Sequence, residues 1–265
     1  MPTIADIAAF LETFAPRRLA ADWDNVGLLT GDPQQTVTKI MTCLTVTPAS
    51  AQEAIREQAE LIVSHHPLPF FPFKQLTTAQ TPTRLLWQLA RAGVAIYSPH
   101  TAFDSAAAGI NQQLAEGLGL TQIQPTIPAP NDPDGLGSGR FGALPDAITL
   151  RELAARLQRF LKIDGLHFVG KDDARVQRVA VGCGSAAKFL PDAVRLGCDT
   201  LVTGEMLFHD CLSAEAQGVS VLLPGHYASE RFACERLAEV LRQPFPQLTI
   251  WPSRAEVDPL RWVNA

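Results

Sequence analysis

The sequence predicts an α/β protein built from two similar α/β lobes, each a mixed sheet flanked by helices. Two observations indicate this class. Short apolar segments of strand length alternate with amphipathic helical segments, and a stretch rich in proline and glycine interrupts that alternation near the middle of the chain. The 265 residues, 46% hydrophobic and 18% charged, are enough to bury a core in each of two domains.

Capping residues and strand-length apolar runs define the elements expected in the first lobe. A threonine stands before each expected helix, and proline follows at the first helical position of two of them. The expected helices are Ile4–Phe14 after Thr3, Pro48–Glu60 after Thr47 and Pro82–Arg91 after Thr81. The expected strands are Lys39–Leu44, Leu61–Ser64 and Val94–Tyr97. This order is typical of βαβ units with parallel strands.

A domain boundary is expected in Gln124–Gly142, where prolines, glycines, Asn and Asp exclude a helix or a central strand. Residues 1–123 with 224–265 would form the metal-binding lobe, and residues 124–223 the second lobe. In the remaining chain, Thr149 and Glu152 predict a capping box. The further expected helices are one that is capped by Thr149 and runs to about Leu161, one ending at Gly197 and one ending near Arg242. The further expected strands are Leu166–Val169, Val176–Val181, Thr200–Thr203, Val219–Leu223 and Leu248–Trp251.

Composition excludes several classes of function. The formal net charge is −5 and no basic run stands out, so nucleic acid is an unlikely partner and a small-molecule substrate is expected. No apolar stretch is long enough to cross a membrane, and the N-terminus lacks the pattern of a signal peptide. The five cysteines are scattered singly, as expected of small buried thiols in a cytoplasmic protein.

Metal-ligand residue types follow three expected strands. His65 and His66 follow Leu61–Ser64, and His100 and Asp104 follow Val94–Tyr97. His226 and Glu230 follow Val219–Leu223. Ligands of open α/β sheets gather outside the carboxyl ends of the strands, so we expect these side chains to converge on a metal site in the cleft between the lobes.

Spacing and residue type predict a pair of divalent ions there, bound by His65, His66, Asp104, His226 and Glu230. His226 and Glu230 are four apart at a helix start and so share one face. Neighbouring imidazoles in an extended chain point apart, so His65 and His66 suit two ions better than one. A mixed set of imidazoles and carboxylates suits Zn, Mn or Fe better than calcium.

Several other residues have competing interpretations. His167, among apolar neighbours, is expected to be an ordinary polar residue, and Phe70, Phe71 and Phe73 are expected to serve packing or subunit contact.

Gly182–Ala187 follows the spacing of a dinucleotide-binding loop, with Glu205 at the distance of a ribose-binding acid, but a tight strand-to-helix turn is the favoured interpretation. That turn could also hold an anion or form one wall of the active cleft. Glu205 and His209, four apart on an expected helix, would form a proton-transfer or ligand-supporting pair.

Four segments resemble the GTP cyclohydrolase I type 2 homologue family, also called the dinuclear metal centre hexameric proteins. They are SHHPLPF (Ser64–Phe70), HTAFDSAAAGIN (His100–Asn111), TGE with a later histidine (Thr203–Glu205, His209) and PGHYASE (Pro224–Glu230). DWDNVGLLTGD (Asp22–Asp32) and GSGRFG (Gly137–Gly142) extend the resemblance over nearly the whole chain. The resemblance implies two α/β lobes, a hexameric toroid and a two-metal site whose ligands match the five residues named above. The chain departs from the family at Thr45, where Asp is usual, and at Phe208, where a histidine is frequent.

Three functions are compatible with these residues. The first is a metal-dependent hydrolase acting on a nucleotide or phosphate ester, in which two ions would acidify a water and stabilise developing charge. Its candidates for proton handling are His100, Glu205 and His209. These titratable residues exceed the number that metal coordination requires, which favours an enzyme over a purely structural metal site. The second is a non-enzymatic scaffold, regulator or metal carrier held together by the ions. A dinucleotide-dependent oxidoreductase resting on Gly182–Ala187 ranks last.

Overall fold

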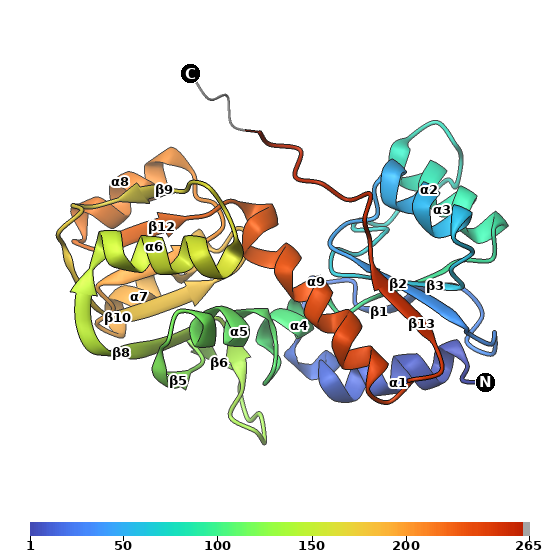
Figure 1. Ribbon diagram of the computed structural model, residues 1–265, viewed down its shortest axis with the longest axis horizontal. Helices are drawn as coiled ribbons and strands as arrows, with labels where there is room; N and C mark the ends of the chain where they lie inside the picture. The colour runs from blue at the N-terminus through green and yellow to red at the C-terminus, as the bar shows by residue number, and fades with distance from the viewer. Residues whose placement is uncertain (262–265) are drawn as a thin grey trace. The chain divides into compact units, whose positions relative to one another are not determined.

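The chain folds into two compact units, which the computed structural model describes over residues 1–261 (Figure 1). The first unit comprises residues 1–103 with 233–261, and the second comprises residues 104–232. The sequence placed these divisions at 123/124 and 223/224. The segment before residue 124 joins the second unit because its last strand, β5, pairs with β8 of the second sheet.

Helices and strands alternate along most of the chain, as expected of an α/β protein. The helices are α1 (Ile4–Phe14), α2 (Pro48–Arg56), α3 (Thr81–Arg91), α4 (His100–Ser105), α5 (Ile110–Gly117), α6 (Leu150–Leu161), α7 (Leu190–Arg195), α8 (Phe208–Ala216) and α9 (His226–Arg242), with 3-10 turns η1 (Arg17–Leu19) and η2 (Ala187–Phe189). The strands are β1 (Gly27–Thr30), β2 (Lys39–Cys43), β3 (Leu61–Ser64), β4 (Ala95–Ser98), β5 (Thr121–Gln124), β6 (Ile127–Pro128), β7 (Gly137–Ser138), β8 (Arg140–Thr149), β9 (His167–Val169), β10 (Arg175–Gly182), β11 (Thr200–Thr203), β12 (Ser220–Leu223) and β13 (Thr249–Pro252).

The first unit contains a mixed five-stranded sheet of order β1-β4-β3-β2-β13. Strands β13, β2, β3 and β4 are parallel, and β1 pairs antiparallel with β4. All residues of β3 and β4 are buried, as expected where helices cover both faces of a parallel sheet. Figure 1 shows α2 and α3 on one face and α1 with the end of α9 on the other.

Alternation along the strands divides the side chains between these two faces. Met41 and Ile62 pack with α2 and α3, in a core that also contains Leu86 and Leu89 of α3. Thr42 points to the opposite face, where its hydroxyl donates to the Cys234 carbonyl of α9 at 2.8 Å. The carboxyl ends of β3 and β4 therefore emerge from a tightly packed layer that holds the residues after them in place.

The second unit contains a mixed six-stranded sheet of order β5-β8-β10-β11-β12-β9. Its centre is parallel, with β10, β11 and β12 in register, and the outer strands run antiparallel. Apolar residues of the sheet pack against α7 and α8, and α6 lies across the sheet (Figure 1). Two mixed sheets flanked by helices confirm the predicted fold class.

The strand β8 is the main correction to the expected elements. Its first residues, Arg140, Phe141 and Gly142, belong to the stretch from which a central strand was excluded, yet β8 pairs with both β5 and β10. Pairing on both sides of residues 141–143 outweighs the poor strand propensity of Gly142, and Pro145 lies where the pairing of β8 with β10 is irregular. A smaller correction concerns α3, which begins at Thr81 with Gln80 before it and no side-chain cap. The Thr3, Thr47 and Thr149 caps are confirmed.

Among the described residues, no helix is long and apolar enough to cross a membrane.

Candidate functional site

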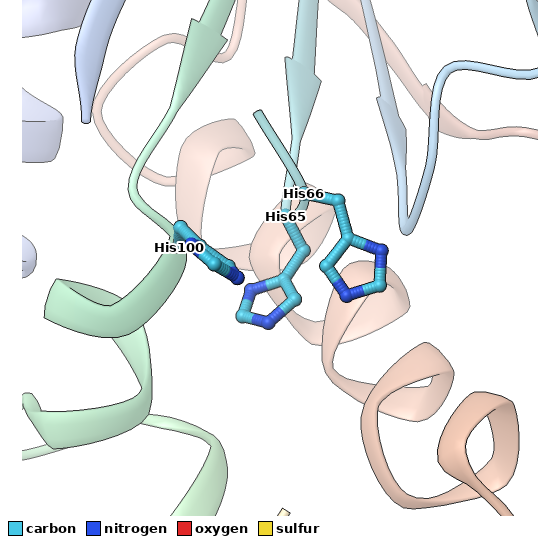
Figure 2. A group of neighbouring side chains, drawn as sticks. All are labelled: His65, His66 and His100. Carbon is cyan, nitrogen blue, oxygen red and sulfur yellow. The ribbon is translucent and has the colours of Figure 1, made fainter. Parts of the chain in front are cut away.

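Three imidazoles of the first unit form one cluster, made of His65, His66 and His100 (Figure 2). The ring centroid of His65 lies 5.1 Å from those of both His66 and His100, and the latter two are 5.6 Å apart. One ring nitrogen from each residue lies within 4.8 Å of the others, a spacing compatible with a common metal ion. The cluster forms because β3 and β4 are parallel neighbours whose carboxyl ends lie at the same edge of the sheet.

Hydrogen bonds hold the backbone of the two consecutive histidines. The amides of His65 and His66 donate to the carbonyls of Cys43 and Leu44 at 2.9 and 2.8 Å, extending the pairing of β3 with β2 beyond the last strand residue. Ser98 donates its hydroxyl to the His65 carbonyl at 2.6 Å. Both imidazoles are thus carried on backbone with little freedom to move, as a binding site requires.

Thr45 orients His66. Its hydroxyl shares a hydrogen bond of 2.7 Å with His66 Nδ1, which leaves Nε2 as the nitrogen available for a ligand. The Thr45 amide and the Leu44 amide donate to the buried carboxylate of Glu256 at 2.6 and 2.9 Å. The departure at Thr45 therefore falls on a residue that supports the site, and Glu256 is a supporting residue that the sequence did not reveal.

Asp24 orients His100 in the same way. The Asp24 side chain is 1% exposed, and its carboxylate lies 2.7 Å from His100 Nδ1. The carboxylate also accepts hydrogen bonds from the Thr101 hydroxyl and amide at 2.5 and 3.1 Å. Burial opposes ionisation of Asp24, but these hydrogen bonds outweigh it and lower its pKa to about 2. An ionised carboxylate only accepts hydrogen bonds, so Nδ1 carries the proton and Nε2 faces the cluster.

His100 also has an unusual backbone conformation. Its φ is +27°, in a region that non-glycine residues rarely occupy, and it begins α4 one residue beyond the end of β4. Strained conformations of this kind persist where neighbouring interactions hold them, and they concentrate at functional sites. Here the Asp24 hydrogen bonds hold the ring, which supports a functional assignment for His100.

The second unit contains its own donors, at the start of α9. His226 Nε2 lies 3.1 Å from Glu230 Oε2, which confirms that the two residues share a helix face. His226 Nδ1 lies 2.9 Å from Glu205 Oε1. The hydrogen bond to Glu230 raises the pKa of His226 to about 9 against the opposing effect of burial, with a further contribution from Glu205. A divalent ion would compete for the same imidazole nitrogen and carboxylate oxygen.

Asp104, the remaining expected ligand, is held by residues that follow β10. The Cys183 thiol donates to Asp104 Oδ1 at 3.1 Å, and Asn111 donates to the Asp104 carbonyl at 3.1 Å. Asn111 in turn accepts from the Cys183 amide at 2.8 Å. Burial raises the pKa of Cys183 well above its usual value, and the Asp104 and Glu230 charges add to the effect. Cys183 is thus more than the inert apolar thiol expected from sequence, and the glycines on either side of it were the only signal.

The glycine-rich turn after β10 packs against Glu230. Gly184 has a φ of +60°, and a Cβ added to it would stand 2.2 Å from Glu230 Oε1. Its amide donates to Ser229 Oγ at 3.0 Å. The turn leads into the short η2 and α7 rather than a long helix, so its small residues allow close packing beside His226 and Glu230. This geometry favours the tight turn over a dinucleotide-binding loop.

Other candidates lie in more exposed positions. Glu205 precedes α8 and His209 lies within it, so the two do not share a helix as expected. Both are exposed, and the His209 ring contacts Phe208 with centroids 5.6 Å apart. His167 is exposed on the edge strand β9 rather than enclosed by apolar neighbours.

The donors present fit a transition-metal ion in the chemistry of their atoms. Taken separately, the first unit contains the imidazoles of His65, His66 and His100, and the second unit contains the carboxylates of Asp104 and Glu230 with the imidazole of His226. Neutral imidazole and carboxylate ligands suit Zn, Mn and Fe. Three of the four histidines have Nδ1 engaged by a side-chain oxygen, which is the usual arrangement around metal-ligating histidines.

Fold and donor groups thus define an α/β protein with clustered side chains that could hold a metal ion, placed after the strands of its sheets. The chain belongs to the Duf34/NIF3 (NGG1p interacting factor 3) family, whose model matches residues 2–259. This membership confirms the resemblance to the GTP cyclohydrolase type 2 homologues.

Individual relatives cover nearly the whole chain. It is 32% identical over 238 residues to a protein of Clostridium perfringens named GTP cyclohydrolase 1 type 2 homolog, with 90% of each chain covered. It is 37% identical over 206 residues to a protein of the same name from Nostoc, with 77% of each covered. The fold matches the crystal structure of a Bacillus cereus protein related to NIF3 with a TM-score of 0.91, at 23% identity and 99% coverage of both chains.

Proposed function

We propose that this protein is a metal-dependent hydrolase acting on a nucleotide or phosphate ester, with a small molecule as its substrate. Two divalent ions, Zn, Mn or Fe, would be held by His65, His66, Asp104, His226 and Glu230. When bound, such ions lower the pKa of a water molecule and stabilise negative charge that develops on the substrate. The names of the relatives from Clostridium perfringens and Nostoc are consistent with this class of chemistry.

One observation carries the proposal: the three imidazoles of the first unit gather within 4.8 Å, and two of them have Nδ1 held by a side-chain oxygen. An imidazole fixed in this way presents a single nitrogen in a single direction, as metal binding and proton transfer both require. Three imidazoles in one cluster would repel one another when protonated, whereas in their neutral forms they can share a metal ion.

We assign proton handling to His100, Glu205 and His209. Asp24 holds a proton on His100 Nδ1, so Nε2 accepts a proton from a nucleophile or returns one to a leaving group. Glu205 contacts His226 and would steady that ligand. His209, exposed on α8, would act on the part of the substrate nearest to solvent.

The test is reconstitution of chelated protein with Mn²⁺ or Zn²⁺, followed by assays on a panel of nucleotides and phosphate esters. We expect metal-dependent hydrolysis and about two bound ions per chain by elemental analysis. Glu230→Ala should lose both, whereas Glu239→Ala, an exposed glutamate on the same helix, should keep both. Stoichiometric metal with a raised melting temperature and no turnover of any substrate would favour a scaffold or metal carrier instead.

We further propose a homohexamer in the cytoplasm. None of the five cysteines, all of which lie in the described chain, forms a disulfide, as expected for a reducing compartment. The hexamer follows from the family resemblance and is tested by light scattering coupled to gel filtration, where a monomeric mass would contradict it.

A further inference from the structure

Three aromatic side chains lie exposed beside the imidazole cluster. Trp23 is 60% exposed, Phe70 is 41% exposed and Phe71 is 75% exposed. We call these three residues the aromatic platform. Phe73 is also exposed. None of Phe70, Phe71 and Phe73, for which packing or subunit contact was expected, is therefore buried in the core of the first unit.

The platform is in contact with His100. The Trp23 and Phe70 rings lie 6.0 and 5.9 Å from the His100 ring, both edge-on, and 6.0 Å from each other. Phe71 extends the group, with its centroid 4.7 Å from that of Phe70. The exposed aromatic rings and the largely buried imidazoles are therefore joined by continuous ring contacts within the first unit, and His100 belongs to both groups.

Hydrogen bonds made by side chains hold the two loops that carry the platform. The Asn25 side chain donates to the Pro69 carbonyl at 2.9 Å, which joins the loop of Trp23 to the loop of Phe70. Next to Trp23, Asp24 is fixed by His100 and Thr101. Side chains that are exposed on anchored backbone are preorganised, so a ligand that stacks on them loses little conformational entropy on binding.

Exposed aromatic side chains that gather in one place favour contact with a ligand, because such contact removes apolar surface from water. A planar ring fits better than an aliphatic group, since it can stack on Trp23 and Phe70 while its substituents extend past His100. Base–aromatic stacking is favourable for every nucleobase. The platform alone would not select a nucleotide, but its continuity with a candidate metal-binding cluster would, because an anionic group could then bind at the imidazoles.

We propose that the aromatic platform is a binding subsite for the base of a nucleotide whose hydrolysable group lies at His65, His66 and His100. This assignment rests on the proposed function and narrows it. The substrates would be nucleotides, and sugar phosphates without a base would bind weakly.

The test compares guanosine 5′-monophosphate with ribose 5-phosphate, which carries the same phosphate without a base. Their dissociation constants are measured by calorimetry on the metal-reconstituted full chain. We expect guanosine 5′-monophosphate to bind about tenfold more tightly. Trp23→Ala should remove most of that preference and leave the affinity for ribose 5-phosphate unchanged, and Trp23→Phe should restore part of it. Trp87→Ala, which removes another exposed tryptophan, on α3, is the matched control and should keep the preference.

Equal affinities for the two ligands, or a preference that survives Trp23→Ala, would overturn the assignment. So would a change in oligomeric mass on Trp23→Ala with the preference intact, because the platform would then be a contact between copies of this chain. Failure of the proposed function has a different signature. A base preference without hydrolysis of any substrate would contradict the hydrolase assignment and leave the subsite supported. Equal kcat/KM values for nucleotides and sugar phosphates would contradict the subsite and leave the hydrolase assignment supported.

Discussion

The carboxylate of Asp24 lies 2.7 Å from Nδ1 of His100, and its side chain is almost completely buried. The pair joins a loop before β1 to the first residue of α4, and it fixes which nitrogen of His100 faces the other imidazoles. Asp24 was not singled out as a site residue from sequence. The same pairing of carboxylate and imidazole is used in enzymes that need a histidine in one tautomer.

Asp24→Asn should therefore lower kcat by roughly 10–100-fold and leave the metal content nearly unchanged, since it removes the partner of a proton-handling group. Steady-state kinetics with elemental analysis of each preparation checks this. Asp22→Asn, at an exposed position two residues earlier, is the control and should behave as wild type. Loss of metal in Asp24→Asn would reassign His100 as a ligand.

Thr45→Val should weaken metal binding by roughly 10–100-fold, because it removes the hydroxyl that holds His66 Nδ1 while keeping the side-chain shape. Thr45→Asp, which introduces the residue usual in the family, should retain or increase the affinity by offering a charged partner. Competition titration of Zn²⁺ against a chromophoric chelator measures both. Thr13→Val, on the exposed side of α1, provides the comparison. An affinity for Thr45→Val equal to wild type would show that His66 needs no support.

Gly184→Ala should lower metal affinity, because the new Cβ would meet Glu230 Oε1 at 2.2 Å and push the carboxylate aside. Gly197→Ala is a matched control: its φ of +69° resembles the +60° of Gly184, but nothing lies within 4 Å of the added Cβ. Both variants should lose about 1–2 kcal/mol of unfolding free energy from left-handed backbone strain. Only Gly184→Ala should also lose metal, as judged by the same titration. Equal metal affinities in the two variants would contradict the placement of Glu230.

Glu53→Gln should destabilise the first unit by about 2–3 kcal/mol, because the buried carboxylate accepts hydrogen bonds from Trp251, Ser253, Arg254 and Ala255. Burial opposes ionisation of Glu53, but these bonds outweigh it and lower its pKa below 4.5. The ionised carboxylate therefore stabilises the first unit at pH values above 4.5, and this stabilisation is lost as the pH falls through the lowered pKa of Glu53.

Denaturant unfolding at neutral and at acidic pH measures this effect. The difference in the free energy of unfolding between wild type and Glu53→Gln should be smaller at acidic pH. Glu57→Gln removes a charge from the residue that caps the same helix, where the side chain is 43% exposed, and should change stability little. If the difference in the free energy of unfolding between wild type and Glu53→Gln did not change with pH, the charge of the Glu53 carboxylate would contribute nothing to stability.

Much of the fold followed from local sequence signals. The segments β3, β11 and α6 have the bounds predicted for them, because apolar runs and threonine caps act within a few residues. The strand β8 was missed because Gly142 and Pro145 weaken its local signal, and pairing with β5 and β10 supplies what propensity lacks.

The sequence by itself determined which side chains are candidates for metal binding. Imidazoles and carboxylates that follow apolar strands are visible in the chain, and parallel pairing brings His65 and His100 to one edge. Only the tertiary structure decided how they are held. Asp24, Thr45, Cys183 and Glu256 act through hydrogen bonds that reach across 21 to 212 residues of chain. Such bonds depend on distances of about 3 Å between atoms, which no local pattern records.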